Sequence, residues 1–186
     1  PAHENSMREA LAGSADFITQ GHAISGNLNF PRRIATAYYN SSVWRIYNRF
    51  ADAVEKALGE YGVRASVNVL KADGGTMPLA VSRLLPVETI LSGPSASVMG
   101  ILALCDIGVD SVVLDIGGTT TDIAVFASGG PLIEPDGIAL NGRNTLVRAL
   151  RTRSIGIGGD SLLRVEGGEA RVGPERLGPA VAFRPH

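Results

Sequence analysis

The segment DIGGTTTD, from Asp115 to Asp122, most constrains how this chain can fold. Apolar runs flank it on both sides, so the pattern predicts two strands joined by a tight turn. Gly117 and Gly118 allow the backbone to approach an anion closely, and successive N–H groups in such a turn can form an anion-binding concavity. The segment therefore predicts a phosphate site, although the same glycines would also suit a plain hairpin turn.

Threonines and aspartates add chemistry to this turn. The hydroxyl groups of Thr119, Thr120 and Thr121 can donate to the same anion. Asp115 and Asp122 stand at the two ends of the turn, and carboxylates beside phosphates suit a hydrated magnesium ion. The eight residues thus predict a site for the phosphates of a nucleotide and for Mg²⁺.

Composition is typical of a folded globular protein, because hydrophobic residues make up 45% of the 186 residues and charged residues 19%. The formal net charge is −1 with both signs interspersed, so no basic surface for nucleic acid or an anionic membrane is indicated. The longest apolar stretch is too short to span a membrane, and the N-terminus lacks the layout of a secretion signal. We expect a cytoplasmic protein with no nucleic-acid or membrane partner.

Cys105 is the only cysteine, which excludes an internal disulfide and a thiolate zinc cluster. It falls on the apolar face of a predicted helix that begins near Pro94, so we expect its thiol to be buried in packing.

Hydrophobic periodicity and turn residues predict the remaining elements. Residues 1–40 carry no sustained period and are expected to form loops and short elements. A mixed sheet is expected because the strands alternate with turns and helices. The predicted helices span 41–61, 78–84 and 94–105, the predicted strands span 67–70, 87–91, 110–115, 123–126 and 146–152, and a hairpin turns at Gly167-Gly168.

A second glycine segment, Asp73, Gly74 and Gly75, follows the predicted strand at 67–70. Ligands in open α/β sheets bind at the carboxyl ends of strands, so these residues are candidates for a substrate loop. An ordinary glycine turn explains them equally well.

A third glycine segment, Gly156 to Gly159, precedes a predicted helix that begins near Asp160. A helix N-terminus at this place could face an anion. As a dinucleotide fingerprint the segment is weak, because its last glycine is missing and it does not open a strand–helix–strand unit.

Taken together, these motifs carry a family resemblance. The run 92–126 resembles the second phosphate-binding segment of the actin, sugar kinase and heat-shock ATPase superfamily. Five motifs follow one another along the chain: DGGTMPL (73–79), PVETILSGPSASVMG (86–100), DIGGTTTDIAVF (115–126), SIGIGGDSLLRV (154–165) and VGPERLGPA (172–180). Through these motifs the chain more narrowly resembles the hydantoinase A/oxoprolinase family over about residues 36 to 180.

The resemblance implies an α/β fold, one lobe of the two-lobed actin-like (ribonuclease H-like) ATPase fold, with a mixed sheet flanked by helices. Residues 1–35 would form an irregular N-terminal segment, and residues 36–186 the lobe with the second phosphate loop. Complete family members use ATP and magnesium to open a cyclic amide such as a hydantoin or 5-oxoproline, and a few relatives support ATP-dependent carboxylation of ketones.

The resemblance also implies roles for the motif residues. Gly117, Gly118 and the three threonines would hold the transferring phosphoryl group. Asp115 would hold magnesium, and Asp122 would share that duty or orient the attacking group. Nucleotide contacts are expected from Gly158, Gly159 and Asp160, and substrate contacts from Asp73, Gly74 and Gly75.

The chain departs from the family pattern in two places. It contains one phosphate loop where family members carry two, and it lacks a recognisable adenine-binding segment. We therefore expect a middle fragment of a larger enzyme, which alone binds nucleotide weakly and turns over little. Its expected partners are the remaining domains, a second hydantoinase subunit and a small cyclic amide. The alternatives are a non-catalytic nucleotide-binding module and a relative of the sugar or acetate kinases.

Overall fold

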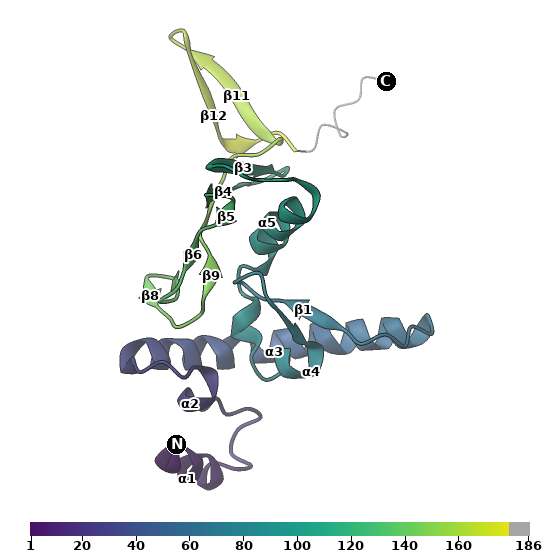
Figure 1. Ribbon diagram of the computed structural model, residues 1–186, viewed down its shortest axis with the longest axis vertical. Helices are drawn as coiled ribbons and strands as arrows, with labels where there is room; N and C mark the ends of the chain where they lie inside the picture. Colours follow the sequence, from purple (N-terminus) through teal and green to yellow (C-terminus); the bar gives the residue numbers. More distant parts are fainter. Residues whose placement is uncertain (179–186) are drawn as a thin grey trace. The chain divides into compact units, whose positions relative to one another are not determined.

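The computed structural model describes residues 1–178, and the end of the VGPERLGPA motif lies outside the described residues. The chain divides into two compact units, and each is described by itself (Figure 1). Unit 1 comprises residues 1–96 and 133–149. Unit 2 comprises residues 97–132 and the chain from 150 onward.

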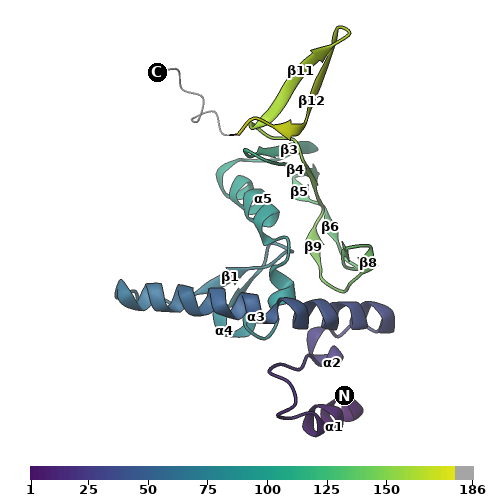
Figure 2. The ribbon, with the colours of Figure 1, turned by 180° about the vertical axis from the view of Figure 1, so that it is seen from behind.

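Helices dominate the first part of unit 1. Helix α1 (Ala2–Ala10) and the short α2 (Gly21–Ile24) occupy the region expected to be irregular, and the long helix α3 spans Phe30–Glu60 (Figure 2). The helix predicted from residue 41 thus begins eleven positions earlier, and the predicted division at 35/36 falls inside it. Asn29 caps α3 by accepting a hydrogen bond from the Arg32 N–H, and Pro31 stands in its first turn.

A small sheet and two short helices follow in unit 1. Strand β1 (Asn68–Leu70) pairs antiparallel with β2 (Thr76–Pro78), and the chain continues into α4 (Leu79–Ser82). These elements confirm the strand predicted at 67–70 and the short helix predicted at 78–84.

The strand predicted at 87–91 is wrong, because Pro86–Thr89 forms a 3-10 helix, η1. Pro86 favours a helical first turn, and the Val87 N–H donates to Asn40 Oδ1 rather than to a neighbouring strand. Val87 packs with Ala72, Val147 and Ala149 in the core of unit 1. The apolar run is therefore explained by burial, which does not distinguish a strand from a helical turn.

The second part of unit 1 contains short strands. Strands β7 (Ala139–Leu140) and β8 (Arg143–Asn144) form a tight antiparallel hairpin, in which Asn141 and Gly142 both have a left-handed φ. Strand β6 (Ile133–Glu134) pairs with β9 (Ala149–Leu150).

Unit 2 is built on a four-stranded antiparallel sheet. Its strands are β3 (Ser111–Ile116), β4 (Thr121–Ala127), β5 (Gly130–Pro131) and β10 (Thr152–Ile155). The order is β10-β4-β3, with β5 also on β4. The strands predicted at 110–115 and 123–126 are confirmed, and the one predicted at 146–152 is divided between β9 and β10.

The expected mixed sheet is not found among these four strands, since all their pairings are antiparallel. A parallel pair needs a crossover from one strand through a helix to the next. Helix α5 (Ser92–Leu104) precedes β3, but the segment before α5 is η1 rather than a strand. No strand–helix–strand unit therefore enters this sheet.

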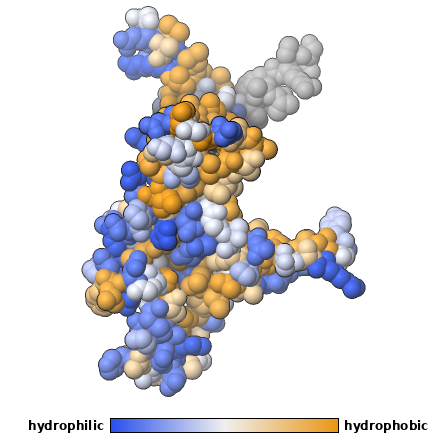
Figure 3. All heavy atoms as spheres, viewed as in Figure 1, coloured by the Kyte–Doolittle hydropathy of each residue, from blue (hydrophilic) through white to orange (hydrophobic). Residues whose placement is uncertain are grey.

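Helix α5 covers one face of the sheet (Figure 1). Val98 of α5 packs with Ala124 and Phe126 of β4 and with Leu150 in a buried core. The opposite face is apolar and open: Val112, Leu114 and Ile116 are 64%, 55% and 65% exposed. Figure 3 shows hydrophobic residues at the surface in this region.

Cys105 is exposed, so the prediction of a buried thiol is wrong. Helix α5 ends at Leu104, and Cys105 therefore falls just beyond the helix face that packs on the sheet.

The last described element is a hairpin of β11 (Ser161–Glu166) and β12 (Glu169–Arg176), visible in Figure 2. Its turn at Gly167-Gly168, where both residues have a left-handed φ, is confirmed. The helix predicted to begin near Asp160 is wrong, since this segment is β11. Leu163 and Val165 pair with residues of β12, so hairpin pairing overrides any local helical preference.

Along residues 1–178, no helix is both long enough and apolar enough to cross a membrane.

Candidate functional site

The predicted hairpin of unit 2 is present. Asp115 lies directly opposite Asp122, and Ile116 lies opposite Thr121, so residues 117–120 form the connection between β3 and β4. The connection closes through one backbone hydrogen bond, from the Gly117 N–H to the Thr120 carbonyl at 2.9 Å. The sequence pattern therefore predicted both the strands and the position of the turn.

Three amides at the tip of this hairpin remain available. Within the part of the chain that the structure describes, the N–H groups of Gly118, Thr119 and Thr120 donate no hydrogen bond. Gly118 and Thr119 are exposed, and Thr120 is half-buried. Backbone N–H groups need a hydrogen-bond partner, and these three have none among the described residues. Successive free N–H groups in a turn can bind an anion.

The third glycine segment lies against the hairpin. The Gly159 N–H donates to the Gly117 carbonyl at 2.9 Å, and the Asp160 N–H donates to the Gly118 carbonyl at 2.8 Å. These two amides are thus used to hold the hairpin and are not free for a nucleotide. The sequence predicted that a helix N-terminus near Asp160 could face an anion. The chain forms strand β11 there instead, so this segment has no helix N-terminus.

Gly158 is required by this contact. A Cβ at position 158 would lie 2.5 Å from the Gly118 oxygen and 2.6 Å from the Gly117 oxygen. Real Cβ atoms do not approach backbone oxygens so closely, so only glycine allows the two backbones to meet without a shift.

At Gly118 an added Cβ would meet only the mobile end of one side chain. A Cβ at this position would lie 3.0 Å from a carboxylate oxygen of Asp160, and φ of Gly118 is not left-handed. The half-buried Asp160 side chain therefore lies beside the tip of the hairpin.

The three threonines do not share one role. Thr121 is buried, and its hydroxyl group donates to the Ile157 carbonyl at 2.7 Å. This hydroxyl fixes the segment before Gly158 and is not open to a phosphate. The hydroxyl groups of Thr119 and Thr120 make no hydrogen bond within residues 1–178.

The two aspartates lie side by side on one face of the sheet. Directly opposed residues of an antiparallel pair point to the same face, so the carboxylates of Asp115 and Asp122 are neighbours. Asp122 is also opposite Ser154 of β10, which continues this polar row. Like charges in this position repel, and a cation would remove the cost.

Ser97 is a member of the site that sequence reasoning missed. Its hydroxyl group, on α5, donates to Asp115 Oδ2 at 2.5 Å. The sequence offers only the small residues of SGPSAS (92–97) as a signal, and small residues are equally typical of close helix packing. No cluster of three or more metal-ligating His, Cys, Asp or Glu side chains occurs in residues 1–178.

The segment Asp73 to Gly75 belongs to unit 1 and forms a turn. The Gly75 N–H donates to Asp73 Oδ1 at 3.0 Å, and the Lys71 ammonium lies 3.2 Å from both Asp73 Oδ2 and Glu88 Oε2. Gly74 has a left-handed φ, as this turn requires. These contacts explain the segment as a structural turn, and its substrate role stays a prediction.

Ionisation of this turn follows from its contacts. Burial alone would raise the pKa of Asp73, but the Gly75 N–H and the Lys71 ammonium outweigh it and lower that pKa. Burial would likewise lower the pKa of Lys71, but Glu88 and Asp73 raise it above its ordinary value.

Comparison with known proteins places the chain in a family. The model of the hydantoinase/oxoprolinase family matches residues 33–182, so the chain belongs to this family. A search of curated proteins found no match.

The chain also resembles a solved structure, titled "Mechanism of ATP-Dependent Acetone Carboxylation, Acetone Carboxylase nucleotide-free structure". The TM-score is 0.70 at 21% sequence identity, and the match covers 95% of this chain. The chain spans 26% of that acetone carboxylase chain. It is therefore a mixed α/β structure that resembles one part of that enzyme.

Proposed function

We propose that this chain supplies the phosphate-binding hairpin and the magnesium-binding acid pair of an ATP-dependent enzyme that opens a cyclic amide, such as a hydantoin or 5-oxoproline. The observation that carries the proposal is the set of free amides at Gly118, Thr119 and Thr120, which stand between two opposed carboxylates. Family membership over residues 33–182 supports the same reading.

The acid pair suits magnesium. Mg²⁺ usually binds proteins through one or two carboxylates and keeps several waters or substrate phosphates, so Asp115 and Asp122 suffice without a third protein ligand. Their repulsion in the free protein is the electrostatic reason for a cation at this place. Ser97 would hold the Asp115 carboxylate in one orientation through its hydrogen bond.

The free amides would act on the transferring phosphoryl group. ATP, when bound, supplies the phosphoryl group that activates the amide carbonyl oxygen of the ring. The N–H groups of Gly118, Thr119 and Thr120 would stabilise charge on its equatorial oxygens by fixed hydrogen bonds. An unactivated ring amide is a poor electrophile, which is the chemical reason to couple its opening to ATP.

Asp160 would contribute through its side chain rather than its amide. Its carboxylate lies beside Gly118, and a bare phosphate there would be repelled. We assign it the outer part of the magnesium site, where it would accept hydrogen bonds from metal-bound water.

A second candidate is ATP-dependent carboxylation of a ketone. The structural match to acetone carboxylase favours it, since the match covers nearly the whole of this chain. The two reactions would share the hairpin and the acid pair, and they differ in the nucleophile and the acceptor.

Two measurements test the proposal. Titration of this chain with MgATP, followed by amide NMR, should shift residues 117–122 with weak affinity, and Asp115→Asn should remove most of the magnesium dependence. In a longer protein that contains this chain, ATP hydrolysis should rise with hydantoin or 5-oxoproline. A rise only with acetone and bicarbonate would favour the second candidate, and unchanged hairpin amides at millimolar MgATP would refute both.

A further inference from the structure

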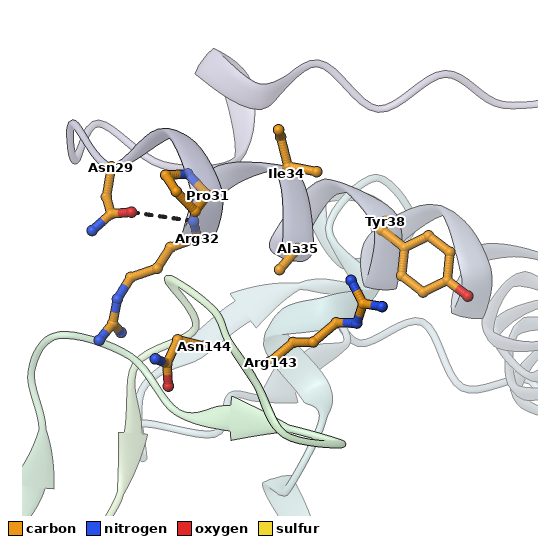
Figure 4. Close-up of a pocket in the computed structure, with 8 residues that line it drawn as sticks. All are labelled: Asn29, Pro31, Arg32, Ile34, Ala35, Tyr38, Arg143 and Asn144. Carbon is orange, nitrogen blue, oxygen red and sulfur yellow. Dashed lines mark hydrogen bonds between the residues drawn. The ribbon is translucent and has the colours of Figure 1, made fainter.

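Unit 1 contains a groove that the function above does not use. It lies between the first turns of α3 and the hairpin β7–β8 and has a volume of about 510 Å³ (Figure 4). Helix α3 contributes Arg32, Ile34 and Tyr38, and the hairpin contributes Arg143 and Asn144. Binding sites for small molecules typically enclose roughly 300–1,000 Å³, so the groove is large enough for a metabolite.

The groove is held open by fixed contacts between its two walls. The Tyr39 hydroxyl donates to the Leu140 carbonyl at 2.8 Å, next to the tip of the hairpin. At its base, Arg32 Nη1 donates to the carbonyls of Asp136 and Thr145 at 2.6 and 3.0 Å. The Leu146 N–H adds a buried bond to the Thr36 hydroxyl at 2.8 Å. The hairpin is therefore fixed on α3 at both ends.

The charge of the groove is positive. The side chain of Arg143 makes no hydrogen bond or ion pair within residues 1–178, and it reaches from the hairpin toward α3 beside Tyr38 (Figure 4). Arg32 bonds only neutral carbonyls with its guanidinium, so its charge is not cancelled by a carboxylate. Among the described residues, no acidic side chain lines the groove.

The wall beside Arg143 is apolar. Tyr38 is 64% exposed, and Ala35 points from α3 toward the hairpin, whereas Ile34 at the rim points away from it (Figure 4). Guanidinium groups bind carboxylates and phosphates through two parallel hydrogen bonds, while an aromatic ring and a methyl group offer area to an apolar body. The groove thus presents a guanidinium group that can donate two parallel hydrogen bonds, next to an apolar patch.

We propose that this groove binds a small organic anion, with its carboxylate or phosphate on Arg143 and its apolar body against Ala35 and Tyr38. The inference is independent of the nucleotide site, because every residue it uses belongs to unit 1.

Two anionic probes that share a phenyl ring and differ in the anionic group test the proposal: 3-phenylpropionate and phenyl phosphate, each titrated into the ¹⁵N-labelled chain. Amide shifts should concentrate at residues 32–38 and 139–145, with affinity in the millimolar range or tighter. Arg143→Gln should weaken binding at least about tenfold, as expected for a lost charge-assisted contact. Whichever head binds tighter identifies the ligand class.

Three controls make the test decisive. Arg49→Gln, at an exposed position further along α3, should leave the affinity unchanged. The uncharged 3-phenylpropan-1-ol should bind much more weakly than either anion. Phosphate binding at the hairpin of unit 2 would appear separately, as shifts at residues 117–122. Equal affinity in the Arg143→Gln variant, or no shifts in the groove with either probe, would overturn the proposal.

Discussion

Asp115 and Asp122 stand directly opposite each other across β3 and β4, so two carboxylates share one face of the sheet. Opposed like charges destabilise an antiparallel pair, by the same scale of about 0.2–1 kcal/mol that favourable pairs contribute. The pair therefore lowers the stability of the metal-free protein, and a divalent cation bound between the carboxylates would remove this repulsion.

Asp122→Asn should stabilise the metal-free chain by about 0.2–1 kcal/mol, because it removes the repulsion while keeping the size of the side chain. The same substitution should reduce the increase in melting temperature that Mg²⁺ gives to the original chain. Thermal unfolding with and without Mg²⁺ measures both effects. Asp106→Asn, at an exposed position of unit 2, is the control and should change neither. If the Asp122→Asn variant were less stable and its melting temperature still rose with Mg²⁺, the assignment of Asp115 and Asp122 as a magnesium-binding pair would be contradicted.

Gly158→Ala should destabilise unit 2 by about 1–3 kcal/mol, the usual cost of forced overpacking. The added Cβ would meet two backbone oxygens, at 2.5 and 2.6 Å, and neither can move as a flexible side chain can. Urea unfolding measures the change. Gly156→Ala is a matched control, since a Cβ there meets nothing within 4 Å. Similar losses in the two variants would show that the close approach is not the cause.

Thr121→Val should cost about 1–3 kcal/mol, because it removes the hydroxyl donor of the Ile157 carbonyl while nearly preserving shape. The segment 156–160 should then exchange its amide hydrogens faster, as the tie that holds it against the hairpin is lost. Hydrogen exchange followed by mass spectrometry gives the local readout. Thr152→Val on β10 provides the comparison, and slow exchange at 156–160 in Thr121→Val would refute the role.

Lys71→Met should lower the free energy of unfolding near pH 7, since Asp73 and Glu88 lose their shared cation. The folded protein lowers the pKa of Asp73, so this contribution is complete above about pH 4, the ordinary range of an aspartate, and is lost as the pH falls through the lowered value. The raised pKa of Lys71 places the opposite loss above about pH 10.5.

The measurement is urea unfolding of both proteins across the acid range. The difference between them should be largest near neutral pH and should shrink below about pH 4. Lys56→Met removes only an exposed pair with Glu60 and should have little effect at any pH. A difference that persists unchanged to pH 2 would show that packing of the lysine stem, not its charge, is responsible.

The local pattern of the sequence was sufficient for the hairpin of unit 2. Apolar runs on either side of DIGGTTTD fixed β3, β4 and the turn, because alternation and glycine content act over a few residues. The resemblance to the hydantoinase/oxoprolinase family was likewise visible in short motifs, and the family match over residues 33–182 confirmed it.

Tertiary contacts decided what the pattern left open. Residues 87–91 and 160–165 are apolar enough for either a strand or a helix, and their partners selected a 3-10 helix in the first and a strand in the second. Local propensity is weak beside such pairing and burial. The start of α3 at Phe30 was missed for a related reason, since its cap and first turns fall in a stretch without a sustained apolar period.

The local pattern of residues 115–122 indicates which residues form the hairpin and supply its charge. Which donors are free depends on contacts made in the folded chain: Thr121 and the amides of Gly159 and Asp160 are used in holding the fold, while Gly118, Thr119 and Thr120 keep open donors. The reason is that each donor makes one good hydrogen bond, and its partner can lie tens of residues away in sequence. Ser97 entered the site in the same way, through a contact across eighteen residues.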